Sequence, residues 1–196
     1  TTVEALSRAL RSDPVDKVRE AAAEALGHLG EKSGTPALIG GLSDQSVDVR
    51  RVSAWGLGNI DPSTATAPLV RALDDADANV RETAAWALGQ GSDHAAVAGL
   101  GRRLHGDDDA HVRHTVAWAL AQVDDRAAVP LLGAALKSDR DADVRAMSAW
   151  ALAQLDAKEA VPLLAAALTD SSADVRSNAA WGIGSIGAEH APAALI

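Results

Sequence analysis

One eleven-residue pattern recurs six times along this chain, and its spacing constrains the fold more than any other feature of the sequence. The clearest copy, residues 80–90, reads V-R-E-T-A-A-W-A-L-G-Q. Successive copies begin 31, 31, 32, 32 and 31 residues apart. A period between about 20 and 50 residues is typical of solenoids, whose stacked repeats bury their apolar faces against one another. The copies begin at Val18, Val49, Val80, Val112, Val144 and Val175.

Each repeat predicts a shorter helix A followed by a longer helix B, which carries the pattern. In helix B, positions 0, 4, 8 and 11 counted from the repeat valine fall on one face at about 100° per residue. In the fifth repeat these positions hold Val144, Ser148, Leu152 and Leu155, the expected core stripe. We therefore predict an all-α solenoid of six two-helix repeats, followed by a truncated first helix of a seventh.

The chain is expected to form a single solenoid over residues 1–196, because each repeat has only its neighbours to pack against. The expected repeats are 1–30, 31–61, 62–92, 93–124, 125–156 and 157–187, with a partial repeat over 188–196.

The starts and stops of helix B are also predicted. A residue that can cap a helix lies three positions before most repeat valines. In the first repeat, Asp13 is the expected N-cap, Pro14 the first helical residue and Gly30 the stop. The other expected N-caps are Ser46, Asp77, Asp109, Asp141 and Ser172.

Position 9 of helix B holds Gly or Ala in every repeat, with Gly27 and Gly58 as examples. Glycine inside a helix costs about 1 kcal/mol relative to alanine. We therefore expect position 9 to lie in close contact with the neighbouring helix B.

An arginine occupies position 1 of every helix B, and an aspartate lies six residues before each of these arginines. Because the planar guanidinium can bridge two acceptors, we predict an Asp–Arg ladder that joins each repeat to the next. The arginines are Arg19, Arg50, Arg81, Arg113, Arg145 and Arg176, and the aspartates are Asp13, Asp44, Asp75, Asp107, Asp139 and Asp170.

Position 6 holds all five tryptophans of the chain and lies opposite the core stripe, between polar positions 2 and 10. An exposed row of indoles is expected there, with amides one turn further on at position 10. The tryptophans are Trp55, Trp86, Trp118, Trp150 and Trp181, and the amides are Asn59, Gln90, Gln122 and Gln154.

The formal net charge of −9 argues against a nucleic-acid-binding protein, which needs a basic face, and suits a cationic partner. The chain has no cysteine, so disulfides and thiolate metal sites are excluded. The sequence contains no apolar run of about 20 residues, so no membrane-spanning helix is predicted. We expect a cytoplasmic protein that is a monomer or a weak end-to-end dimer.

The repeat V-R-x-x-A-A-x-A-L-G-x-I, followed by A-V-P-L-L-x-A-A-L-x-D, resembles the HEAT-like repeats of phycobilisome lyases. The best matches are residues 112–139 and 144–170, and the resemblance covers essentially the whole chain. It implies a right-handed superhelix whose helices B line the concave side. The first repeat also resembles consensus units of artificial binding proteins, which leaves an engineered origin open.

The Trp–amide pairs are similar to the array of armadillo-repeat importin-alpha, whose amides hold a peptide backbone and whose tryptophans sandwich basic side chains. This resemblance implies a non-enzymatic scaffold that binds a protein or extended peptide, with a mild preference for basic segments. The expected contacts are the five tryptophans and the four amides.

Several other interpretations stay open. Each tryptophan could only pack on the neighbouring helix B. The chain could be a bilin lyase-type chaperone that places a tetrapyrrole on the same tryptophans, or an architectural segment of a larger protein. His105, His111, His114 and Asp109 cluster in the sequence, but scattered surface histidines explain them better than a metal site. We expect no catalytic residue, cofactor or metal.

Overall fold

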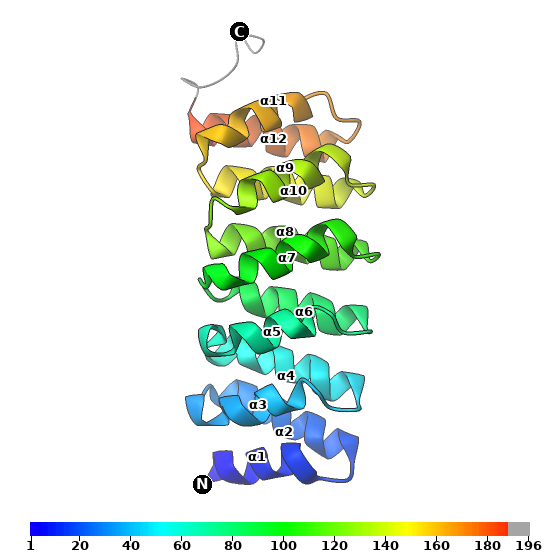
Figure 1. Ribbon diagram of the computed structural model, residues 1–196, viewed down its shortest axis with the longest axis vertical. Coiled ribbons are helices and arrows are strands. Elements are labelled where there is room, and N and C mark those ends of the chain that lie inside the picture. The colour runs from blue at the N-terminus through cyan, green and yellow to red at the C-terminus, as the bar shows by residue number, and fades with distance from the viewer. Residues whose placement is uncertain (188–196) are drawn as a thin grey trace. The chain divides into compact units, whose positions relative to one another are not determined.

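The structure is a computed structural model that describes residues 1–187, so the predicted truncated helix after residue 187 lies outside the described residues. The chain divides into two compact halves, Thr1–Gly99 and Leu100–Ile196. The described residues form helices and turns without any strand (Figure 1), which confirms the all-α prediction.

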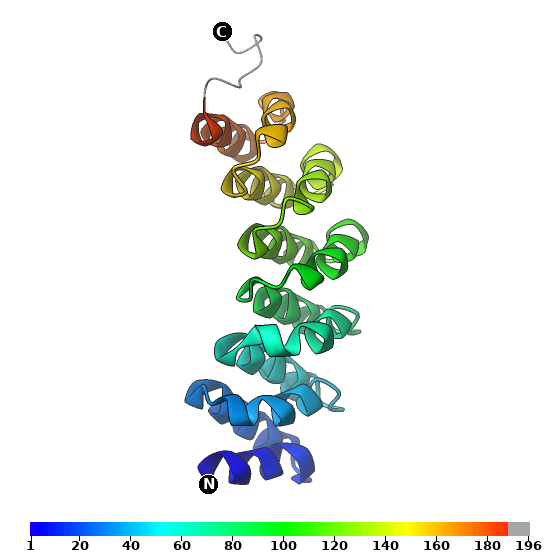
Figure 2. The same cartoon turned by 60° about the vertical axis from the view of Figure 1, so that its left-hand side comes forward.

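In the first half, helices A and B alternate. The helices A are α1 (Thr2–Ser12), α3 (Thr35–Gly41) and α5 (Thr66–Ala72), and the helices B are α2 (Asp16–Leu29), α4 (Val47–Ile60) and α6 (Ala78–Gly89). Helix α4 packs against both α2 and α6, while each helix A packs on the helix B of its own repeat. The helices B of this half thus form one layer and the helices A a second layer (Figure 2).

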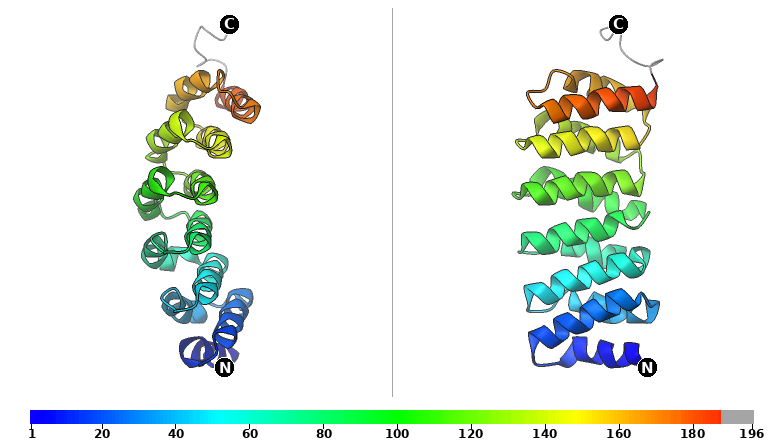
Figure 3. Two further views of the ribbon diagram at one scale, coloured as in Figure 1. Left: turned by 90° about the vertical axis from the view of Figure 1, so that its right-hand side faces the viewer. Right: turned by 180° about the vertical axis from the view of Figure 1, so that it is seen from behind.

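The second half repeats this arrangement. Its helices B are α8 (Ala110–Val123), α10 (Ala142–Gln154) and α12 (Ala173–Ile186), and its helices A include α9 (Ala128–Ser138) and α11 (Val161–Ala167). Helix α7 (Val97–Gly106) begins three residues before the boundary of the halves. Helix α10 packs against α8 and α12, and the helices B of this half run side by side (Figure 3, right).

Short 3₁₀ turns precede four of the helices A. Two of these turns begin at an aspartate, Asp61 or Asp93, whose carboxylate accepts a hydrogen bond from the backbone N–H two residues later. Such local bonds favour a tight turn over a longer helix. The turns are Lys32–Gly34, Pro62–Ala65, His94–Ala96 and Lys158–Ala160.

The predicted start of the first helix B is wrong. Its N-cap is Val15, and the helix begins at Asp16 rather than Pro14. Asp13 ends α1 instead and accepts a hydrogen bond from the N–H of Val15 at 2.9 Å. The other five predicted N-caps occupy the N-cap position, and Gly30 ends α2 with φ 68°, a left-handed conformation that glycine adopts easily.

The predicted core stripe is confirmed in the fifth repeat, where Val144, Ser148, Leu152 and Leu155 are all buried. The Ser148 hydroxyl donates to the Val144 carbonyl at 2.8 Å, so its burial leaves no unpaired hydroxyl. Val18 is the exception in the first repeat, with 42% of its surface exposed.

The predicted close approach at position 9 is present between α2 and α4. A Cβ atom on Gly27 would lie 2.7 Å from Cζ3 of Trp55 and 2.8 Å from Cα of Gly56. Between α4 and α6, a Cβ on Gly58 would lie 2.6 Å from Cζ3 of Trp86. Glycine at this position therefore lets the indole of the next helix B lie directly on the backbone.

Gly27→Ala should destabilise the protein by about 1–3 kcal/mol, because the added methyl group has to push apart two backbones. Gly184→Ala is the matched control, since Gly184 occupies position 9 of α12 and a Cβ there meets nothing within 4 Å. This control should gain up to about 1 kcal/mol from helix propensity. Urea unfolding of both variants tests the contact, and equal effects of the two substitutions would contradict it.

Candidate binding surface on the helix B layer

The surface that carries positions 2, 6 and 10 of the helices B is here called the helix B face. Four of its tryptophans, Trp55, Trp86, Trp118 and Trp150, are half-buried, and Trp181 is 50% exposed. The indoles predicted on an exposed face are thus only partly exposed at four of the five positions.

The half-burial of Trp55 and Trp86 follows from the contacts with Gly27 and Gly58, which each support one side of an indole. His28 adds an edge-to-face contact with Trp55, with the ring centroids 4.9 Å apart. In the first half, packing on the neighbouring helix thus occupies part of each ring, while the remainder faces solvent.

The amides at position 10 differ in how they are used. The Asn59 amide donates to the Trp55 carbonyl at 3.1 Å, so it is engaged by its own helix. Gln90, Gln122 and Gln154 are exposed, and within residues 1–187 their side chains make no hydrogen bond. These three glutamines keep both a donor and an acceptor for a ligand.

In the second half, the helix B face contains a groove of about 500 Å³. Trp118 and Trp150 both line it, whereas Gln122 and Gln154 are not among its lining residues. The structure therefore brings two of the predicted tryptophans together at one hollow. The other lining residues are Ala110, His111, His114, Asp141, Asp143, Ala146, Met147 and Asn178.

Sequence reasoning expected a groove along the tryptophans but did not single out the hollow at Trp118 and Trp150, although a signal was present. Position 2 holds long side chains in the first four repeats but the short Ala146 in the fifth, which leaves space beside Trp150. Asn178 of α12 closes one side, because its amide donates to the Ala146 carbonyl at 2.9 Å.

The clustered histidines do not form a metal centre. Within residues 1–187, no three side chains of the metal-binding types lie close enough to hold an ion. Asp109 caps α8, and His111 and His114 line the groove instead.

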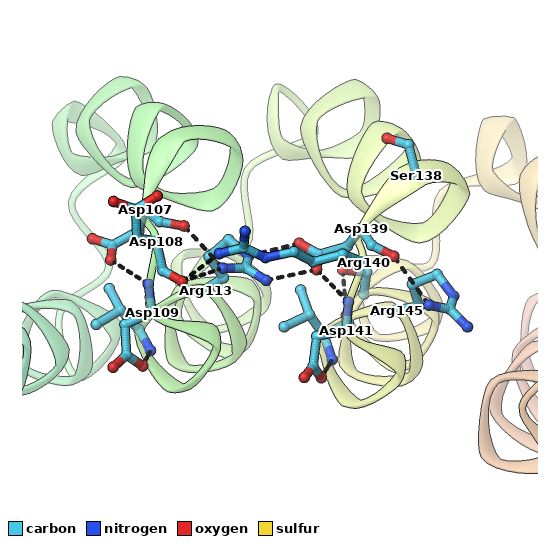
Figure 4. A network of polar contacts seen from close by, with 12 residues as sticks. Asp107, Asp108, Asp109, Arg113, Ser138, Asp139, Arg140, Asp141 and Arg145 are labelled. Carbon is cyan, nitrogen blue, oxygen red and sulfur yellow. Dashed lines mark hydrogen bonds and ion pairs between the residues drawn. The ribbon is translucent and has the colours of Figure 1, made fainter.

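The Asp–Arg ladder is confirmed within each half. Each paired guanidinium bonds both oxygens of the next repeat's aspartate at 2.6–2.9 Å, in the pairs Arg19–Asp44, Arg50–Asp75, Arg113–Asp139 and Arg145–Asp170. Arg113 also donates to the carbonyl of Asp107 in its own repeat at 2.9 Å (Figure 4). One arginine therefore ties together two successive A–B turns.

The ladder also positions the acidic end of the groove. The Asp139 carboxylate accepts hydrogen bonds from the guanidinium of Arg113, and its Oδ1 also accepts one from the N–H of Asp141 at 2.9 Å (Figure 4). Asp141 in turn caps α10 by accepting from the N–H groups of Asp143 and Val144. The start of α10, and with it both groove carboxylates, is thus held by the pairing of Arg113 with Asp139.

The model of the HEAT repeats family matches residues 3–78, 35–121, 66–153 and 129–196. The chain belongs to the HEAT repeat family. The resemblance inferred from the repeat pattern is thereby confirmed. Among curated proteins, no sequence matches this HEAT chain.

Solved structures with a similar fold include the complex of CpcE and CpcF of phycocyanin lyase from Nostoc sp. PCC7120, with 26% identity and a TM-score of 0.69 over 95% of this chain and 77% of that one. A designed armadillo repeat protein in complex with the peptide (KR)4 has 20% identity and a TM-score of 0.70, over 95% and 100% of the chains. An engineered protein has 21% identity and a TM-score of 0.70, over 97% and 98%. At 20% and 21% identity, the likeness of this chain to the designed armadillo protein and to the engineered protein shows the fold alone. No helix in the described part of the HEAT chain is long and apolar enough to cross a membrane.

The Asp–Arg ladder lowers the pKa values of its aspartates. The hydrogen bonds from Arg145 lower the pKa of Asp170 to about 2, and those from Arg19 lower the pKa of Asp44. For Asp139, burial raises the pKa, but the bonds from Arg113 and Asp141 together bring it below its ordinary value. The paired arginines hold these aspartates in the charged form.

Asp139→Asn should destabilise the protein by roughly 3 kcal/mol, because it leaves the guanidinium of Arg113 buried without its counter-charge. The side chains of Arg113 and Asp139 are only 4% and 6% exposed. Glu159→Gln is the control, since Glu159 pairs with Arg126 at 3.7 Å on the surface, where the loss should stay below about 1 kcal/mol. Urea unfolding measures both variants, and a small loss for Asp139→Asn would contradict a stabilising role for the ladder.

Acid should weaken the HEAT fold through the same carboxylates. The pKa values of these carboxylates are lower in the folded than in the unfolded chain. Their contribution to the free energy of unfolding is therefore complete above about pH 5 and is lost as the pH falls toward the folded pKa, which is about 2 for Asp170. The free energy of unfolding, measured between about pH 6 and pH 3, should decrease less steeply in Asp170→Asn than in the parent. Identical pH slopes for the two proteins would count against this origin of acid sensitivity.

Proposed function

We propose that this HEAT repeat chain is a non-enzymatic scaffold whose helix B face binds an extended segment of a partner protein. The observation that carries the proposal is the groove of the second half, where Trp118 and Trp150 line one hollow of about 500 Å³. Half-buried indoles supply large rigid surfaces whose positions are already held by packing, so their ordering costs little on binding.

The exposed glutamines add the polar part of the proposed contact. Gln122 and Gln154 occupy the same position on neighbouring helices B, and packed helices lie about 8–10 Å apart. Two or three residues of an extended chain cover that distance. Successive amides can therefore contact peptide groups that lie two or three residues apart in a bound segment. Each amide can donate one hydrogen bond to its peptide group and accept another from it. The same role is proposed for Gln90 and Asn59 in the first half, where Asn59 has to give up its bond to Trp55.

The charge of the chain favours a basic segment over an acidic one. The net charge is −9, and the groove contains the carboxylates of Asp141 and Asp143. The attraction between a cation and an indole face contributes about 0.5–2 kcal/mol of binding free energy. The proposed partner is accordingly an extended protein segment with a mild excess of lysine and arginine.

We expect fluorescein-labelled basic extended peptides to bind saturably in fluorescence anisotropy, and Trp118→Ala/Gln122→Ala to weaken binding at least about tenfold while the fold is retained. Gln45→Ala is the matched control, because Gln45 is exposed at an A–B turn away from the helix B face. Equal affinity of the parent and the double variant for every peptide would reject the proposal and leave the tryptophans as packing residues.

A second candidate function is a chromophore chaperone, favoured by the 26% identity to the phycocyanin lyase complex. In this reading the same tryptophans hold a tetrapyrrole. Free bilin added in place of the peptide distinguishes the two, since a saturable change in the visible absorbance of the bilin supports the chaperone, and an unchanged spectrum removes it.

A further inference from the structure

Two positions of helix B carry opposite charges that pair with each other in α2 and α4. They are the residue before the repeat valine and the second residue after it, three residues apart and therefore neighbours on the helix surface. In α2, Lys17 pairs with Glu20 at 2.6 Å, and in α4, Arg51 pairs with Asp48 at 3.9 Å. In α2 and α4 the helix thus supplies its own cation to the carboxylate at these positions, whereas α6 holds Asn79 and Glu82 there.

Helix α10 has only one member of this pair. Asp143 corresponds to Asp48, but the residue that corresponds to Arg51 is Ala146. Asp143 is exposed, and within residues 1–187 it forms no ion pair. Ala146 and Asp143 both line the groove. The space occupied by a guanidinium in α4 is therefore open in α10, next to an uncompensated carboxylate.

The surroundings of this space suit a planar cation. Trp118 and Trp150 line the same groove, and indole faces attract guanidinium groups. Asp141 adds a second carboxylate, whose Oδ1 accepts the N–H groups of Asp143 and Val144. The guanidinium of arginine can bond carboxylate oxygens with its fork while its plane lies on an indole, which the ammonium of lysine cannot do.

We infer that the groove between α8 and α10 is an arginine site, which takes the side chain of one arginine of the bound segment between Trp118 and Trp150 and pairs it with Asp143. This inference rests on the proposed function and adds to it a specific residue class at a specific repeat. In the site, the incoming arginine takes the place that Arg51 holds in α4. His111 and His114 from α8 and Asn178 from α12 are the remaining polar groups that face it.

The test uses the five indole N–H signals of the ¹⁵N-labelled protein, assigned through single Trp→Phe variants. The probe is a blocked Gly-Ser peptide with one central arginine, compared with the same peptide carrying citrulline, which has the same shape without the charge, or lysine. The arginine peptide should shift the signals of Trp118 and Trp150 saturably, with little change at Trp55 and Trp86. The citrulline and lysine peptides should bind at least about threefold more weakly.

Two substitutions test the assignment to individual residues. Asp143→Asn should lower the affinity for the arginine peptide by at least about threefold. Ala146→Gln should abolish the shifts of the Trp118 and Trp150 signals, because the longer side chain fills the space in the groove. Asp174→Asn is the matched control, because Asp174 occupies the same position of α12 and is exposed but does not line the groove. Its affinity for the arginine peptide should match that of the parent.

Equal shifts with arginine and citrulline, equal binding of lysine, or equal loss in Asp143→Asn and Asp174→Asn would overturn the arginine site. The longer peptides of the anisotropy experiment separate this failure from that of the proposed function. If they bind through Trp118 while the single arginine has no effect, only the arginine site fails. If neither kind of peptide binds, both proposals fail.

Discussion

The bond between an arginine and the aspartate of the following repeat is the interaction on which the rest of this structure depends. In a solenoid each repeat contacts only its neighbours, so the offset between successive repeats has to be set locally. Arg113 does this by bonding Asp139 with its fork and Asp107 with its remaining nitrogen. Because Asp139 also receives the N–H of Asp141, the same carboxylate sets where α10 begins. The acidic end of the groove thus depends on a buried ion pair.

The contact between glycine and tryptophan reconciles two interpretations of the indoles. Trp55 packs on Gly27 and Trp86 on Gly58, so packing is real, yet all four internal indoles keep part of their surface in solvent. An indole that is held on one side by backbone is a rigid wall on the other. Packing and binding are therefore compatible roles, and the first makes the second less costly in conformational entropy.

Function in a regular repeat protein is expected where the repeats differ. The positions that pair Asp48 with Arg51 in α4 hold Asp143 and Ala146 in α10. The replacement of arginine by alanine at this position leaves both an open space and a carboxylate without its cation. The ladder and the core stripe recur with little variation because every repeat needs them. The groove occurs where a long side chain is replaced by a short one.

Much of this protein was determined by its sequence alone, because the period, the core stripe, the caps and the Asp–Arg spacing are local signals repeated six times. The exceptions there were local as well, since Asp13 accepts the N–H of Val15 and ends α1 instead of starting α2. Only the tertiary structure decided how far each indole is buried and where the helix B face is hollow. Both depend on side chains from neighbouring helices, such as Gly27 beneath Trp55 and Trp118 near Ala146, which no periodicity within one helix specifies.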